Sequence, residues 1–198
     1  MTATLRERSD RSQSTFGADL IEALTACAEL INTGRSPEGE GLSSVADVQA
    51  FGDQYAFHGI GAGPRDAVRL RSHRSRLDAI AASCESGEEA AAIEMLNALL
   101  AETGAVPQIV AHDGRGPHIH VSRPAAPLAD RIAAHLGMGL AELVVAGEME
   151  RVRTCSAQPC RLVFVDLSRN RSRRYCDSRT CGNRLHVAAY RARRSAAG

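Results

Sequence analysis

The chain has 198 residues, a net charge of +1 and a hydrophobic content of 44%. This length and composition suit one ordinary domain with a small second module, and they exclude a chain too polar to bury a core. No apolar run is long enough to cross a bilayer, which argues against a membrane protein. We therefore expect a cytoplasmic protein, in which clustered cysteines bind metal more often than they form disulfides.

Charge is unevenly distributed along the chain. From Arg151 onward, twelve arginines stand against Asp166 and Asp177, a balance of +10, which leaves −9 for residues 1–150. A compact basic module beside an acidic body favours a polyanionic partner.

Helical patterns dominate the region before the basic module. Residues 1–15 are polar and without periodicity, so we expect a disordered tail there. Apolar spacing predicts a first helix over 16–33, a second capped by Ser44, a third opening at Pro64 and a fourth over 86–104. In the third helix the expected buried residues are Val68, Leu77, Ile80 and Cys84.

The spacing of apolar residues changes after residue 105, from a helical to an extended pattern. Residues 106–124 contain an Asp-Gly turn between two short extended runs, which predicts a β-hairpin. A further helix is expected over 126–147, ending at Gly147. The predicted fold class is a mainly α N-terminal domain with one β-hairpin, at 16–150, followed by a small treble-clef or ribbon-like zinc finger at 151–194 and a short tail at 195–198.

Four cysteines carry the clearest chemical signal. Cys155 and Cys160 are separated by four residues, and after a spacer of fifteen come Cys176 and Cys181 with the same separation. Two such pairs can close a tetrahedral Zn²⁺ site with no position open for catalysis, so we predict one structural zinc. Ordinary buried thiols and a disulfide switch are the alternatives.

The segment between the cysteine pairs predicts a strand, a turn around Asn170 and a return strand, with a final helix after the second pair. Backbone N–H groups at the start of that helix are expected to donate to the sulfurs. Cys27 and Cys84 lie on apolar helix faces and are expected in the core.

Residues 151–194 resemble the CGNR zinc-finger family, named for the four residues that stand here as Cys181, Gly182, Asn183 and Arg184. The likeness extends through "DLSRNRSRRYC" at 166–176. Where the family commonly has tryptophans, this chain has Leu162 and Tyr175, which keep apolar bulk. The resemblance implies a zinc module that binds nucleic acid.

The preceding residues are similar to the ABATE domain, which is described as a stress-induced transcription regulator. The similarity depends on "ELINT" at 29–33, "AVRLRSHRSRLDAI" at 67–80 and "LNALLA" at 96–101. It implies a helical regulatory body joined to the finger.

Arginines of the finger are the expected contacts to DNA, because a guanidinium can grip phosphate or read guanine in the major groove. Asn183 could also read a base edge or brace the loop after Cys181. The candidate nucleic-acid-binding residues are Arg169, Arg171, Arg173, Arg174, Asn183, Arg184, Arg191 and Arg194. Alternatively, these charges keep the module soluble or pair with the acidic body.

A small-molecule effector pocket in the body is a further hypothesis. Its candidate residues are Asn32, Arg71, Arg74, His118 and His120, where the two histidines share one face of the predicted hairpin. Surface arginines, a helix-terminal asparagine and ordinary hairpin histidines are the alternatives.

The sequence thus favours a zinc-dependent regulator that binds duplex DNA, with the helical body sensing a signal or forming a homodimer. An RNA-binding protein and a zinc-stabilised protein-interaction module are the alternative functions. We predict no catalysis, because no Gly-rich phosphate loop and no nucleophile elbow occur in the sequence.

Overall fold

The computed structural model describes residues 16–36, 39–57, 61–111, 116–177 and 181. The predicted tails at 1–15 and 195–198, and the final helix after the second cysteine pair, lie outside these ranges. The elements are α2 (Ala18–Asn32), α3 (Val45–Gln54), α4 (Asp66–Ser86), α5 (Glu89–Glu102), β1 (Gln108–Val110), β2 (His118–His120), α6 (Leu128–Val145), a 3-10 turn (Met149–Arg151), β3 (Val152–Thr154) and β4 (Val163–Val165).

Helix boundaries follow local chemistry. The Ser44 side chain accepts the Asp47 N–H at the start of α3, and the Asp47 carboxylate accepts the Ser44 N–H in return, which forms a capping box. Gly87 at φ +75° ends α4, and Gly147 at φ +69° follows α6. These left-handed conformations cost glycine little, so each glycine can end its helix; the end at Gly147 was predicted from the sequence, whereas Gly87 lies inside the range predicted for the fourth helix.

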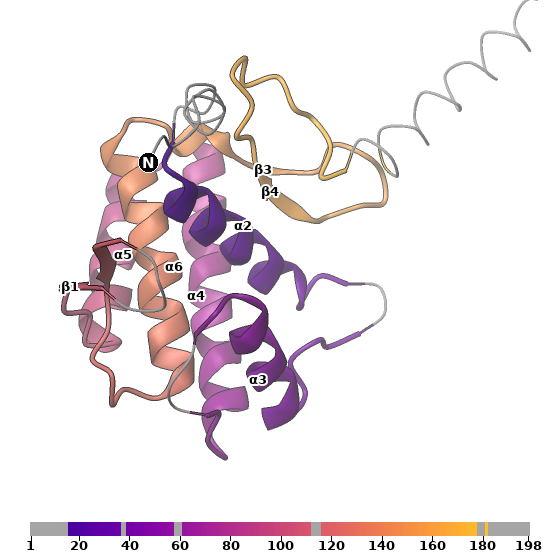
Figure 1. Cartoon of the computed structure of the whole chain (residues 1–198). Helices are drawn as coiled ribbons and strands as arrows, with labels where there is room; N and C mark the ends of the chain where they lie inside the picture. The colour runs from indigo at the N-terminus through magenta and orange to yellow at the C-terminus, as the bar shows by residue number, and fades with distance from the viewer. Residues whose placement is uncertain (1–15, 37–38, 58–60, 112–115, 178–180, 182–198) are drawn as a thin grey trace, which may run out of the picture.

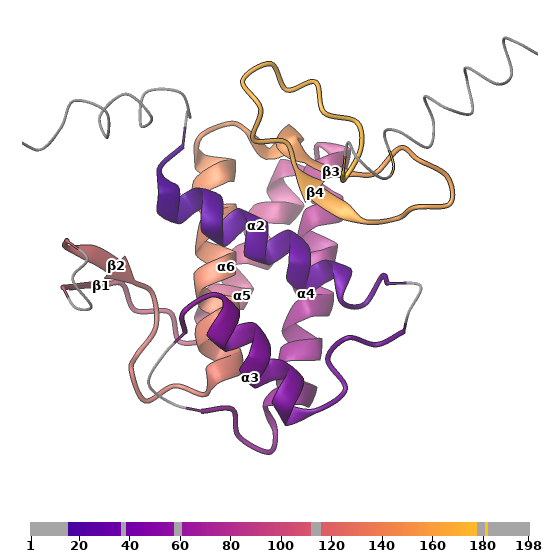
Figure 2. The same ribbon diagram turned by 45° about the vertical axis from the view of Figure 1, so that its right-hand side comes forward.

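The core lies among the helices. Helices α4, α5 and α6 run side by side, and α2 and α3 lie across them (Figures 1 and 2). Fully buried side chains come from α2, α4, α5 and α6 and include Leu24, Leu30, Leu70, Leu77, Leu99, Ile132 and Leu136. Cys27 and Cys84 belong to the same core, as predicted. No helix in the described part of the chain is both long and apolar enough to cross a membrane.

The predicted fold class is confirmed: a mainly helical N-terminal region with a β-hairpin precedes a C-terminal cysteine cluster. One detail of α4 differs from the expectation. Val68 was expected to be buried but is 65% exposed, whereas Leu70 and His73 are buried. The buried stripe of α4 runs through residues 70, 73, 77, 80 and 84, and a residue two positions before Leu70 points to the other side of the helix.

A polar cluster is buried between α4 and α6. The Asp130 carboxylate lies 2.8 Å from Nε2 of His73 and also pairs with Arg69. The other ring nitrogen of His73, Nδ1, has no partner among the described residues. The Asp130 carboxylate is therefore the group that satisfies the buried imidazole.

Replacing Asp130 with alanine should lower the free energy of unfolding by about 2 to 4 kcal/mol, because it leaves the buried His73 ring without a partner. Urea unfolding followed by circular dichroism measures this change. Asp53→Ala, at an exposed position of α3, is the matched control and should change little. Equal stability of the two variants would contradict a structural role for the cluster.

Candidate zinc centre and its junction with the helical domain

Four cysteine sulfurs come together beyond the β3–β4 hairpin. The Sγ atoms of Cys155, Cys160, Cys176 and Cys181 all lie within 4.8 Å of one another. The Sγ of Cys176 is 3.8 Å from that of Cys160 and 3.7 Å from that of Cys181. In a tetrahedral zinc centre with Zn–S bonds of about 2.3 Å, neighbouring sulfurs are about 3.8 Å apart. The geometry therefore fits Zn²⁺ bound by four thiolates, a structural site.

Burial and hydrogen bonding act on the ionisation of the clustered thiols. Burial raises the pKa of the Cys176 thiol, and the side chains of Cys155 and Cys181 raise it further. At Cys155 burial opposes ionisation, but N–H donors from the backbone of Cys176 and Ala157 leave the thiol pKa below its ordinary value. Four thiolates this close together need a cation, and zinc supplies the required charge.

The connection between the cysteine pairs differs from the prediction. A return strand was expected after Asn170, but β4 pairs antiparallel with β3, which precedes the first cysteine pair. The turn near Asn170 is present, with Arg171 at φ +50°. Residues 166–177 contain no strand, and the expectation of a return strand there was wrong.

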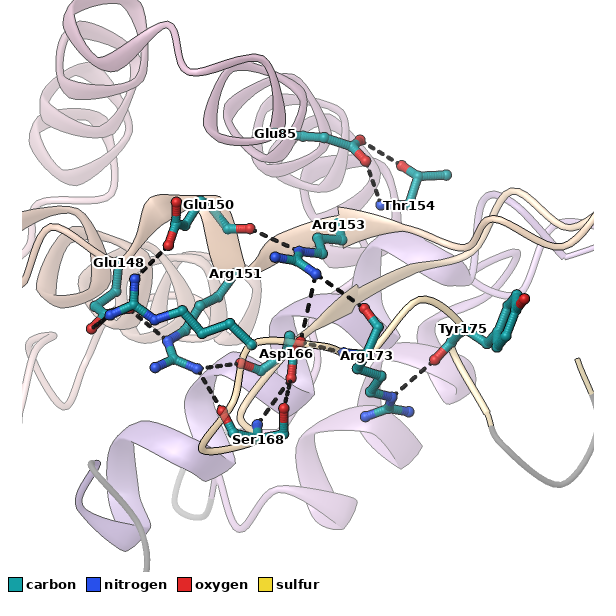
Figure 3. Close-up of polar contacts among 11 residues, drawn as sticks. Glu85, Glu148, Glu150, Arg151, Arg153, Thr154, Asp166, Ser168, Arg173 and Tyr175 are labelled. Atoms are coloured by element: carbon teal, nitrogen blue, oxygen red, sulfur yellow. Dashed lines mark hydrogen bonds and ion pairs between the residues drawn. The ribbon is translucent and has the colours of Figure 1, made fainter. Parts of the chain in front are cut away.

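Asp166 explains why residues 166–173 form a loop. Its carboxylate is fully buried and accepts the N–H and hydroxyl of Ser168 and the N–H of Arg173, at 2.7 Å for the latter. Burial opposes ionisation, but these hydrogen bonds and the nearby Arg153 leave the pKa of Asp166 below its usual value. The loop therefore folds around a carboxylate, which competes with strand pairing (Figure 3).

The β3–β4 hairpin is packed on the helical body. Val152, Val163 and Val165 belong to the same hydrophobic core as the helices. Arg151, at the start of the hairpin, is only 2% exposed; it pairs with Glu148 and donates to the carbonyls of Asp166 and Ser168 (Figure 3). The finger thus shares its first half with the core of the helical domain.

Polar contacts from two helices hold the hairpin in place. The Asn32 carboxamide at the end of α2 donates to the Val163 carbonyl and accepts the Val163 N–H, both at 2.8 Å. At the end of α4, the Glu85 carboxylate accepts the N–H and hydroxyl of Thr154, both at 2.7 Å (Figure 3). These contacts set the position of the hairpin relative to the helices.

The finger arginines predicted to bind nucleic acid are in different situations. Arg171 pairs with Glu148 and Glu150 of the helical body. Arg173 lies over the Phe164 ring at 5.0 Å and donates to the carbonyls of Tyr175 and Cys176. Arg169 and Arg174 are exposed, and their side chains have no partner among the described residues. The other candidates, Asn183, Arg184, Arg191 and Arg194, lie outside the described residues.

Residues predicted to line an effector pocket do not all lie together. Arg71 donates to the Leu42 carbonyl, and Arg74 forms two bonds to Glu40, each 2.6 Å long. These bonds from Arg74 are the main cause that lowers the pKa of Glu40 to about 2. Asn32 binds the hairpin, as described above. The effector pocket stays a prediction.

The two predicted pocket histidines lie elsewhere in the fold. His118 and His120 share one face of β2, as predicted, with their Nε2 atoms 3.2 Å apart. The β1–β2 hairpin projects away from the C-terminal end of α2 in both views of the molecule (Figures 1 and 2).

Sequence reasoning missed the contacts of the junction. The pairs Asn32 with Val163 and Glu85 with Thr154 join residues far apart in the chain, for which periodicity and spacing contain no signal. Asp166 is the exception, because it can be singled out in the sequence as one of two acidic residues in the arginine-rich segment that begins at Arg151.

Comparison with known protein families gives two matches. Residues 24–147 match the ABATE family, described as "Putative stress-induced transcription regulator". Residues 151–194 match the family described as "CGNR zinc finger". No curated protein matches the chain. Neither family description names an enzymatic activity.

Chelation of the zinc should expose four of the six thiols to iodoacetamide, because zinc ligands become free while core cysteines stay buried. Burial raises the pKa of the Cys27 thiol to about 12 and that of Cys84 to about 11. Mass spectrometry after alkylation at pH 8 should therefore find four modified cysteines with chelator and far fewer without it. Modification of Cys27 or Cys84 in the chelated protein would contradict independent burial of these thiols.

Replacing Asn32 with aspartate should lower the free energy of unfolding of the zinc-loaded protein by about 1 to 3 kcal/mol, because the Val163 carbonyl loses its donor. Asn97→Asp is the matched control: it makes the same change of charge at an exposed position of α5. Chemical unfolding measures both variants. A loss no larger for Asn32→Asp than for the control would exclude Asn32 as a structural link.

Proposed function

Since the chain belongs to the ABATE family and carries a CGNR zinc finger, we propose that this zinc-binding regulator acts on transcription by binding duplex DNA through the finger. In this proposal zinc holds the basic loops of the finger in fixed relation. The helical domain senses a signal or forms a homodimer.

The observation that carries the proposal is the basic charge that the body does not neutralise. Glu148 and Glu150 pair with Arg151 and Arg171. The side chains of Arg161, Arg169 and Arg174 are exposed and have no ion-pair partner in the described part of the chain. Guanidinium groups left in this way can bind phosphate through paired N–H donors. The acidic body thus offsets part of the charge and leaves a basic surface.

The two aromatic residues of the finger that the structure describes favour duplex DNA over single-stranded RNA; Tyr190 lies outside the described residues. Phe164 is buried beneath Arg173, and Tyr175 is half-buried against the cysteine cluster. Neither ring is a fully exposed platform on which bases could stack, the feature that single-strand readers use.

A role in self-association is supported by the β1–β2 hairpin. Ile109 and Ile119 face each other across the two strands and are 81% and 59% exposed. An exposed apolar pair of this kind suits a second copy of the chain, and two fingers would bind DNA more tightly than one.

The proposal is tested by selecting bound duplexes from random-sequence DNA with the zinc-loaded full-length protein, beside a chelated sample. An enriched sequence that is lost on chelation is the expected result. Tighter binding to structured RNA than to duplex DNA would show an RNA-binding protein instead. Binding to another protein that persists at high salt and without nucleic acid would indicate a protein-interaction module.

A paired variant test addresses the basic surface itself. Replacing Arg161 and Arg169 together with alanine should reduce the slope of log affinity against log salt by about two, because two phosphate contacts are lost. The matched control replaces Arg65 and Arg123, which are exposed on the helical domain, and makes the same change of net charge. If the two double variants have equal slopes of log affinity against log salt, Arg161 and Arg169 of the finger loops do not contact DNA.

A further inference from the structure

A pocket lies at the junction of the finger and the helical domain, beside the C-terminal end of α4. It has a volume of about 320 Å³. Its lining includes Arg153, Ser156, Phe164, Arg173 and Arg174 of the finger. We call it the junction pocket; sequence reasoning placed Arg173 and Arg174 on a basic surface but assigned no role to Arg153 or Ser156.

Hydrogen-bond donors without partners line this pocket. Arg153 uses Nε and Nη1 to reach the carbonyls of Glu150 and Arg173, and Arg173 uses Nε and Nη2. One terminal nitrogen of each guanidinium is left over. The whole Arg174 guanidinium and the Ser156 hydroxyl have no partner among the described residues. A set of donors with three cationic members suits an anion with several oxygens.

Buried groups behind the pocket hold the arginines in position. The fully buried Asp166 accepts the Arg173 N–H at 2.7 Å and lies 3.6 Å from Nη1 of Arg153 (Figure 3). The Phe164 ring, 5% exposed, lies under the Arg173 guanidinium. Because these side chains are ordered before a ligand arrives, binding costs less entropy than it would at a mobile arginine.

Two carboxylates also line the pocket, and both have other partners. Glu85 accepts two hydrogen bonds from Thr154, and Glu150 pairs with Arg171. Three arginines against two carboxylates leave the lining with one net positive charge. That charge matches a singly charged phosphodiester better than a doubly charged free phosphate.

We infer that the junction pocket binds a backbone phosphate of the nucleic acid, with Arg153, Arg173, Arg174 and Ser156 as its donors. The inference rests on the proposed function and specifies one of its contacts. It also places the bound phosphate near the C-terminal end of α4, because Glu85 of α4 lines the same pocket.

The sharpest test adds one charge without changing shape. Ser156→Asp places a carboxylate in the pocket, and Ser156→Asn is the isosteric neutral control. Fluorescence anisotropy with a 20-base-pair duplex should show about five- to tenfold weaker binding for the aspartate variant, with one zinc per chain in both proteins. Equal affinities of the two variants would overturn the inference.

A second pair removes a donor. Arg174→Ala should reduce the salt slope by about one. Arg65→Ala makes the same change of net charge at the opposite end of α4, which has 21 residues and is about 30 Å long. If both variants keep the slope of the unmodified protein while DNA binding persists, the junction pocket is not a phosphate site and the proposed function survives.

If the protein binds no duplex DNA, a titration with inorganic phosphate still tests the junction pocket as an anion site separately from the proposed DNA function. Side-chain Nε–Hε signals of Arg153 and Arg173 in the full-length zinc-loaded protein should shift with phosphate, and the shifts should be absent in Ser156→Asp. Shifts without DNA binding would keep an anion site and reject the DNA function. No shift and no DNA binding would reject both.

Discussion

The β3–β4 hairpin is the element on which the rest of the molecule depends. Its valines are buried with the helices, and its turn carries the first cysteine pair. A zinc module of this size seldom has enough apolar residues for a core of its own. Here it uses the core of the helical domain, so the position of the metal relative to α2 and α4 follows from packing rather than from a linker.

The charged side chains of the finger fall into two groups. One group stabilises the structure: Arg151 is buried beside Glu148, and Asp166 organises the loop that leads to the second cysteine pair. Among the described residues of the finger, Arg161, Arg169 and Arg174 are exposed and have no ion-pair partner. Asn32 of α2 and Glu85 of α4 join the helical domain directly to the hairpin, so polar contacts as well as apolar packing hold the finger against the helices.

Local signals were sufficient for much of the fold and for the metal site. Periodicity and capping residues such as Ser44 and Gly147 predicted the helices, and the spacing of the cysteines predicted the zinc ligands. Strand pairing in the finger was not predictable in this way, because β4 could pair with residues on either side of it. The choice is made by the valine faces and by the buried Asp166, which are tertiary effects.

Shared folding of the hairpin is tested most directly by amide hydrogen exchange in the zinc-loaded and the chelated protein. The amides of Val163 and Asp166, which donate to Asn32 and Arg151, should stay protected after chelation. Those of Ser156 and Cys160, which donate within the zinc loops, should lose protection. Loss of protection at all four amides would show that the hairpin depends on zinc and not on the helical core.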